Sequence, residues 1–201
     1  MRRYIGDDRG LTHASGDVRI PRFLLNDLTR YWRTVTVDFV YKQRADNDKK
    51  WALRNAKLRM SRKLIFAAGL ALVFSCHLDP AAAEARQALK EKDSSLLTAF
   101  VEQQLMLTPL EIIAKSCVDL EVSDRTKRDI FDNYDRFLSL LDDGEKRGEL
   151  ERARTHDDLR SSGAWRAVRE LSRPFHQGLV KLFLDEDPRL KKLTRNMVCF
   201  R

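Results

Sequence analysis

Residues 64–76 read LIFAAGLALVFSC and form the most apolar stretch of the chain. The stretch carries no charged side chain, and a helix that is apolar on every side is usually buried. It is also much shorter than the roughly 20 residues that a helix needs to span a bilayer. The basic residues just before it, at 59–63, imitate the flank of a membrane anchor. Because of its length we nevertheless predict a buried central helix and no membrane partner.

The sequence on both sides of this stretch has the spacing of amphipathic helices. Between Arg22 and Gln43, apolar residues recur every three or four positions, as on one face of a helix. The β-branched run at 34–37 leaves a strand as a local alternative there. Thr108 and Pro109 mark the start of a later helix, because threonine can cap it and proline suits its first position. Further helices are predicted over residues 51–76, 81–105, 109–120, 124–141 and 163–184.

The chain contains only 8 glycines and 5 prolines, whereas all-β folds need many turns. We therefore predict an all-α protein, an antiparallel helical bundle of about six to eight helices. Residues 1–20 are expected to be an N-terminal loop or the remnant of a preceding domain, and residues 21–201 the helical domain. A sub-boundary near 143–162 is left open, and residues 156–162 are expected to be a polar linker.

Charge is distributed unevenly along the chain. The net charge is +8, and residues 1–63 hold 16 Lys and Arg against 7 Asp and Glu, so the whole excess lies in the first third. This indicates a local basic surface facing an anionic partner. Cys76, Cys117 and Cys199 are too few and too far apart for a disulfide framework, which favours a cytoplasmic location.

The densest basic segment is interleaved with tryptophans. Arginine and lysine beside aromatic rings can hold phosphates and stack on bases. The alternative is a solvated helix face with its tryptophans in the core. The candidate phosphate- or nucleic-acid-binding residues are Arg30, Arg33, Arg54, Lys57, Arg59, Arg62 and Lys63, with Trp32 and Trp51 as candidate stacking residues.

No complete catalytic motif is present. The sequence contains no glycine-rich phosphate loop, no G-x-S-x-G and no H-E-x-x-H, so we expect no catalytic residue and no metal ligand. Residues 169–176, RELSRPFH, fit loosely an Arg-x(4–6)-His pattern of small helical ribonucleases of the HEPN type, in which a histidine could do acid–base work. Pro174 should kink the helix between Arg169 and His176.

One segment resembles a known group of proteins. Residues 21–34 (PRFLLNDLTRYWRT), Val37-Asp38-Phe39 and residues 51–63 (WALRNAKLRMSRK) resemble the helical region after the catalytic domain in bacterial proteins of the DNA polymerase beta-like nucleotidyltransferase superfamily. Residues 108–110 (TPL) and 134–138 (YDRFL) are similar to later landmarks of that region.

The resemblance implies the accessory half of such an enzyme without its chemistry. Members of the superfamily hold the nucleotide with a Gly-Ser turn and bind Mg²⁺ with an Asp-x-Asp pair. Residues 46–48 (DND) lie between predicted helices without a Gly-Ser before them, so they do not match that pair. The resemblance therefore implies a catalytic domain in cis or in trans, and Mg²⁺ and a nucleoside triphosphate only where that domain is present. The start of the chain reads as the end of a preceding domain.

Two function classes follow. In the first, the chain is a helical accessory domain that contributes phosphate, nucleotide or acceptor binding through its basic surface. In the second, it is a stand-alone basic nucleic-acid-binding protein or a toxin–antitoxin-like helical interaction protein. Whether the chain forms part of an enzyme stays uncertain at this point.

Overall fold

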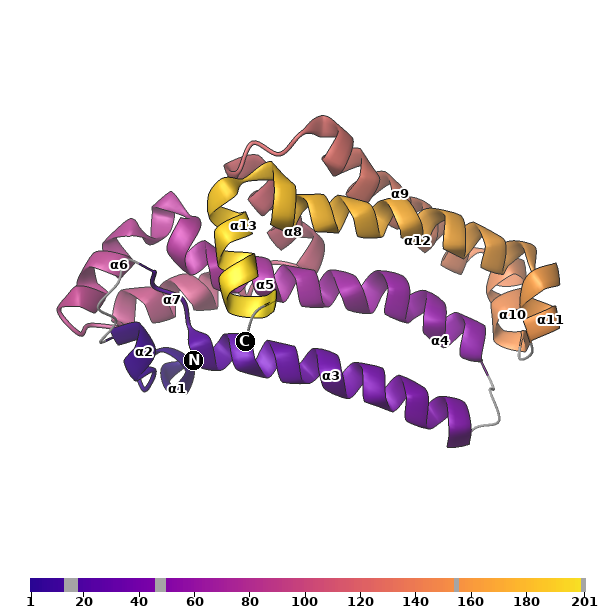
Figure 1. The fold of residues 1–201 in the computed structure, drawn as a ribbon, viewed down its shortest axis with the longest axis horizontal. Helices are drawn as coiled ribbons and strands as arrows, with labels where there is room; N and C mark the ends of the chain where they lie inside the picture. The colour runs from indigo at the N-terminus through magenta and orange to yellow at the C-terminus, as the bar shows by residue number, and fades with distance from the viewer. Residues whose placement is uncertain (13–17, 46–49, 154–155, 200–201) are drawn as a thin grey trace. The chain divides into compact units, whose positions relative to one another are not determined.

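The structure is a computed structural model that describes residues 1–12, 18–45, 50–153 and 156–199 (Figure 1). Within these residues the chain is all-α and forms no strand, which confirms the predicted fold class. More helical segments are present than the six to eight expected, because several short ones flank the long helices. The chain divides into two compact units, residues 1–31, 65–121 and 187–201, and residues 32–64 and 122–186.

The first unit is built around α5 (Lys63–Leu78). Most of the stretch at 64–76 is buried, as predicted, and Val73, Phe74 and Cys76 are fully inaccessible to solvent. Gly69 lies against the side chain of Leu28 on α3 (Arg22–Ala45). The other helices of this unit are α1 (Arg2–Ile5), α2 (Arg9–Thr12), α6 (Ala83–Lys90), α7 (Ser95–Gln104), α8 (Pro109–Asp119) and α13 (Pro188–Thr194), with a 3₁₀ turn at Pro80–Ala82 and a π-helical turn at Arg195–Cys199.

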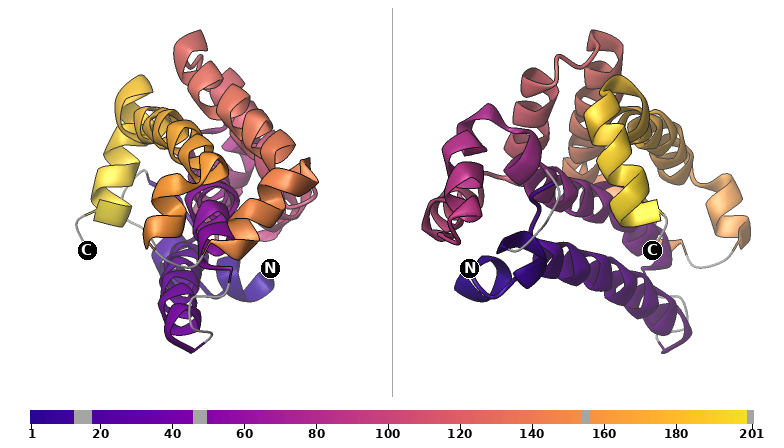
Figure 2. Two further views of the ribbon diagram at one scale, coloured as in Figure 1. Left: turned by 90° about the vertical axis from the view of Figure 1, so that its right-hand side faces the viewer. Right: turned by 60° about the vertical axis from the view of Figure 1, so that its left-hand side comes forward.

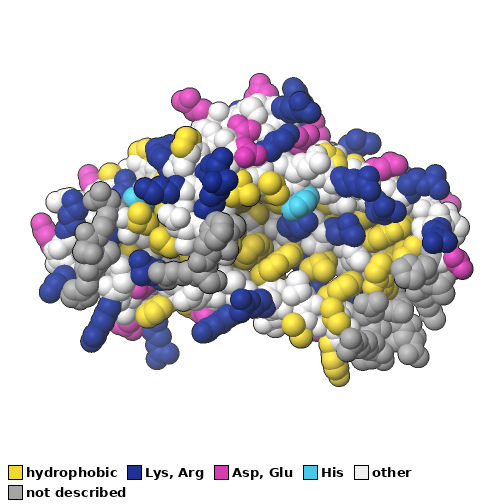
Figure 3. Space-filling view, viewed as in Figure 1, with side chains coloured by type: hydrophobic (Ala, Val, Ile, Leu, Met, Phe, Trp, Pro, Cys, Tyr) yellow, Lys and Arg dark blue, Asp and Glu magenta, His cyan; other side chains and the backbone are white. Residues whose placement is uncertain are grey.

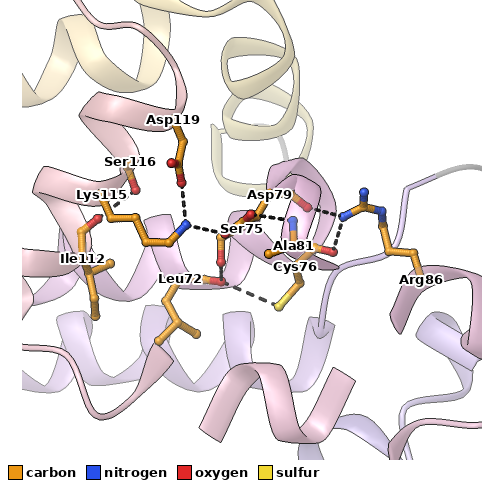
Figure 4. A network of polar contacts seen from close by, with 10 residues as sticks. All are labelled: Leu72, Ser75, Cys76, Asp79, Ala81, Arg86, Ile112, Lys115, Ser116 and Asp119. Carbon is orange, nitrogen blue, oxygen red and sulfur yellow. Dashed lines mark hydrogen bonds and ion pairs between the residues drawn. The ribbon is translucent and has the colours of Figure 1, made fainter. Parts of the chain in front are cut away.

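A buried carboxylate fixes the end of α5 (Figure 4). Asp79 accepts hydrogen bonds from the Ala81 amide at 2.9 Å and from the Lys115 ammonium at 2.5 Å. Lys115 also contacts Asp119, and Arg86 donates to the carbonyl oxygens of Cys76 and Asp79. Because every charged group in this network has a partner, its role is structural.

The second unit is built around two long helices, α9 (Asp124–Asp142) and α12 (Gly163–Lys181), which lie side by side (Figures 1 and 2). Phe137 and Phe175 are fully buried in this unit, and the Phe175 ring lies 5.8 Å from that of Tyr134. The second half of α3 belongs here too, with α4 (Trp51–Lys57), α10 (Gly144–Arg152), α11 (His156–Ser161) and π-helical turns at Leu58–Arg62 and Leu182–Glu186.

Polar side chains fix the helix ends, as several sequence signals predicted. Thr108 and Glu111 form a reciprocal capping box at α8, and Ser123 caps α9. Glu186, at the end of the second π-helical turn, accepts hydrogen bonds from the Ser123 amide and hydroxyl and from the Thr126 hydroxyl. It thereby holds that turn against the N-terminus of α9.

Two predictions differ from the structure. Residues 1–12 form two short helices where a loop was expected, since the buried Asp8 carboxylate accepts hydrogen bonds from the amides of Leu11, Arg22 and Phe23. The expected linker at 156–162 is largely the helix α11. Residues 143–162, where a sub-boundary was left open, lie inside the second unit.

The β-branched run at 34–37 is helical, as the spacing of apolar residues around it predicted. Pro174 lies inside α12, which continues past it to Lys181.

Among the described residues, one helix, Trp51–Leu78, is long and apolar enough to cross a membrane by length and composition. Half of its most apolar window is buried inside the protein, as in the core helix of a soluble protein. The helices α7 and α8 pass the same test only as a pair, and they are bent by 113° relative to each other.

Candidate anion-binding site

The exposed face of α12 carries a row of cations. Arg166, Arg169, Arg173 and His176 are spaced three, four and three residues apart, which places them on one side of a helix. All four are exposed, whereas the opposite side of the helix is buried in the core. Figure 3 shows Lys and Arg side chains gathered over α12. The hydrophobic periodicity that packs this helix therefore also aligns its cations.

A second helix adds two more cations to this face. The first π-helical turn and α4 pack against α12, and they bring Arg59 and Lys63 toward it. The Arg59 guanidinium lies over the Trp165 ring, 5.7 Å from its centroid, and its Nε donates to the Asn55 side-chain oxygen at 2.8 Å. A cation over an aromatic face is attracted by the ring quadrupole. Arg59 is thus held in place by contacts that leave its charge uncompensated.

The electrostatics show that these cations lie within reach of one another. Partial burial, together with the charges of Arg169 and Arg173, lowers the pKa of Arg59. Partial burial and Arg59 lower the pKa of Lys63. Partial burial and Lys63 in turn lower the pKa of His176 below its ordinary value. The charged forms of Arg59, Lys63 and His176 are thus disfavoured first by burial and second by a neighbouring cation, and an anion bound beside them would offset both effects.

No carboxylate among the described residues forms an ion pair with Arg59, Lys63, Arg166, Arg169 or Arg173. Elsewhere in the second unit such pairs do form, for instance between Lys181 and Asp129 at 3.2 Å. Arg160, at the edge of the cavity, lies 4.0 Å from the Asp157 carboxylate.

A cavity of about 280 Å³ opens beside the row. Its walls are Leu159, Arg160, Trp165, Arg166, Arg169, Glu170 and Arg173. Leu159 and Trp165 supply apolar surface, and Glu170 is the single carboxylate of the lining. We call this cavity together with its cations the cationic groove, defined by Arg59, Lys63, Arg160, Arg166, Arg169, Arg173 and His176.

The seven basic residues predicted from sequence are dispersed over the fold. Arg59 and Lys63 belong to the cationic groove. Arg30 lies in the first unit, where its guanidinium is 3.3 Å from the Asp27 carboxylate. Arg33 is exposed on α3, and the Arg54 guanidinium donates to the Lys42 carbonyl oxygen at 3.4 Å. The remaining two lie on the helix of Arg59: Lys57 is exposed and Arg62 is half-buried.

The predicted stacking residues are both half-buried. The Trp51 ring lies 6.4 Å from that of Phe39 and 5.6 Å from that of Trp165, so it supports the tryptophan on which Arg59 rests. Its indole N–H is buried and has no hydrogen-bond partner among the residues that the structure describes. Trp32 lies on α3 in the same unit. Trp51 therefore packs against Trp165, which lines the groove.

Sequence reasoning did not assign the α12 arginines to the binding set. Arg169 and His176 were singled out only for a loose ribonuclease-like pattern, whereas Arg166 and Arg173 were not singled out. Their spacing of three and four residues, which places them on one side of a helix, is the sequence signal that could have identified them. Within the described residues no group of three or more His, Cys, Asp or Glu could hold a metal ion. The acidic residues 46–48 lie outside the described residues.

Comparison with known proteins gives no match to a family model, to a curated protein or to a solved structure.

Proposed function

We propose that this chain is a helical domain that binds the phosphate groups of a nucleotide or of its acceptor through the cationic groove. In this proposal it serves nucleotidyl transfer as an accessory domain. The observation that carries the proposal is the gathering of Arg59, Lys63, Arg169 and Arg173 beside one cavity, where Glu170 is the one acidic side chain of the lining and none of the four cations forms an ion pair with a described residue.

The bland interpretation of these residues is a solvated helix face. Charges on such a face are normally interspersed with the opposite sign or lie far enough apart to be screened. Here partial burial, and after it the charges of Arg169 and Arg173, lower the pKa of Arg59, a group that is almost always protonated. A phosphate group would remove the repulsion between these charges, because its oxygens accept charge-assisted hydrogen bonds from several guanidinium groups at once.

The proposal assigns binding and no bond-breaking step to this chain. The sequence resemblance supports it, because Arg59 and Lys63 fall inside the segment that carries the resemblance. A catalytic domain, in cis or in trans, would supply the acidic residues that hold Mg²⁺ with the nucleoside triphosphate.

Calorimetric titration with inorganic tripolyphosphate and with ATP at low salt tests the proposal. Arg59→Ala and Arg173→Ala should each weaken binding about tenfold, the lower end of the roughly 1.5 to 3 kcal/mol that a hydrogen bond to a charged group contributes. Arg136→Ala is the matched control, because Arg136 is exposed on α9 in the same unit and outside the groove. Absence of binding to every phosphate compound at low salt, or equal losses in all three variants, would overturn the proposal.

The alternative, a toxin–antitoxin-like interaction protein, makes a different prediction. It expects a stable oligomer or partner complex that phosphate does not affect. Light scattering of the purified chain, with and without tripolyphosphate, separates the two. The alternative would be favoured by an oligomer whose mass and stability do not change when tripolyphosphate is added, together with no heat of tripolyphosphate binding.

A further inference from the structure

We infer that the ligand of the cationic groove is a single strand of nucleic acid, with successive backbone phosphates laid along α12. This inference rests on the proposed function and narrows its ligand from any phosphate compound to an extended polyanion. Three observations carry it: the length of the cation row, the order in which the cations influence one another, and the small cavity with mixed walls.

The row is long. Arg166 and His176 are ten positions apart on one helix, which corresponds to about 15 Å at a rise of 1.5 Å per residue. The phosphorus atoms of a triphosphate are joined through single bridging oxygens, so that group could meet only part of the row. In a nucleic-acid strand a sugar separates each phosphate from the next. Such a strand distributes its charges over the whole length.

The cations follow one another along the groove and do not surround a single point. Arg169 and Arg173 line the same cavity as Trp165, the ring over which Arg59 lies, and their charges contribute, after burial, to the lowered pKa of Arg59. Lys63 feels Arg59, and His176 feels Lys63, so positive charge continues away from that position. At the other end the arginines at 160 and 166 line the cavity. The groove therefore offers several consecutive positions for phosphate groups.

The cavity fits one base. Its 280 Å³ lies just below the roughly 300 to 1,000 Å³ of pockets that enclose drug-sized ligands, so most of a larger ligand must lie outside it. Leu159 and Trp165 form the apolar part of its lining, and only 9% and 6% of their surfaces are exposed, so a base would contact just that part of each side chain. Glu170 would repel a phosphate, whereas its carboxylate can accept a hydrogen bond from the amino group of a base. A duplex keeps its bases paired and could not fill this cavity.

Fluorescence anisotropy with labelled RNA oligonucleotides measures the ligand length directly. We expect the affinity to rise with length and to level off at roughly four nucleotides, near the lower limit of site sizes for single-strand-binding folds. With about four phosphates contacted, the logarithm of the binding constant should fall against the logarithm of salt concentration with a slope near −3. Arg169→Ala and Arg173→Ala should each reduce that slope by about 0.7, and the control Arg136→Ala should leave it unchanged.

The same titrations can overturn the inference without touching the proposed function. If tripolyphosphate binds as tightly as the longest RNA, with an affinity that does not depend on oligonucleotide length, the groove takes a compact phosphate group and the inference fails. Tighter binding of the matching duplex would refute it as well, because the cavity would then have no base to hold. If neither tripolyphosphate nor RNA binds at low salt, both the inference and the proposed function fail.

Discussion

Replacing Arg173 with glutamine should raise the stability of the unliganded protein while weakening phosphate binding. Arg169 and Arg173 are one turn apart on α12, and like charges at that spacing cost about 0.2 to 0.5 kcal/mol. The repulsion between Arg173 and Arg59 adds a cost of similar size. Because Arg173 is exposed, solvent keeps both effects small. The attraction between Arg173 and Glu170, three residues before it, offsets one of these two costs. We therefore expect a gain of about 0.2 to 0.5 kcal/mol at low salt.

Differential scanning fluorimetry measures this gain as a shift in melting temperature. For a chain of this length 1 kcal/mol corresponds to roughly 2 to 4 °C, so Arg173→Gln should melt about 0.5 to 2 °C higher than the parent. The difference should vanish near 1 M salt, where the Debye length is about 3 Å. Saturating tripolyphosphate should reverse the order, because a ligand at a hundred times its Kd stabilises the parent by about 2.7 kcal/mol.

The matched control is Arg136→Gln on α9. Arg136 has Asp132 one turn before it, so its replacement removes an attraction and should not stabilise the protein. The reasoning is refuted if Arg173→Gln lowers the melting temperature at low salt, or if its gain persists unchanged at 1 M salt. Either result would mean that the like charges around Arg59 do not burden the unliganded fold.

Three further predictions concern the core, a helix cap and the histidine of the groove. Phe175→Ala should lower the free energy of unfolding by about 3 to 5 kcal/mol in urea, because this fully buried ring packs against Tyr134; a loss below 1 kcal/mol would contradict that packing. Thr108→Ala should cost about 1 kcal/mol in the same assay through loss of its hydrogen bond to the Glu111 amide, whereas Thr108→Ser should cost much less. The NMR-measured pKa of His176 should lie below 6.5, because burial and Lys63 disfavour its charged form, and tripolyphosphate should raise it. Since the unfolded chain then binds more protons, stability should fall as pH drops below 6.5 toward the native pKa, a slope that His176→Gln should remove.

The helices were predictable where their signals are local. The capping box at Thr108 and the apolar stretch at 64–76 involve neighbouring residues, and the structure confirms both. The short helices α1 and α2 were not predictable in this way. They depend on Asp8, whose carboxylate is fixed by amide groups of Arg22 and Phe23, and a run of polar residues does not reveal that contact. Helices this short gain little from their own hydrogen bonds, so tertiary contacts decide whether they form.

Only part of the candidate site could be predicted from the sequence, for two reasons. Charge averaging pointed to residues 1–63, where cations outnumber acids, and so it found Arg59 and Lys63. On α12 itself cations outnumber acids, but the acidic residues on either side of the helix, at 157–158 and 185–187, cancel the excess over a longer window. The approach of the α12 arginines to Arg59 depends on how two helices pack that are about a hundred residues apart in the sequence. No periodicity within either helix specifies that approach.

The position of Arg59 in the cationic groove depends on the aromatic side chains that pack beneath it. Trp51 packs on Trp165, and Trp165 carries Arg59 on its face, so the core sets the position of the guanidinium group. The buried Trp51 N–H, which has no partner among the described residues, is a cost that a smaller apolar residue would avoid. A large flat ring at residue 51 nevertheless gives Trp165 a wide surface to rest on. Through this stacking the position of the Arg59 guanidinium depends on the packing of both tryptophans.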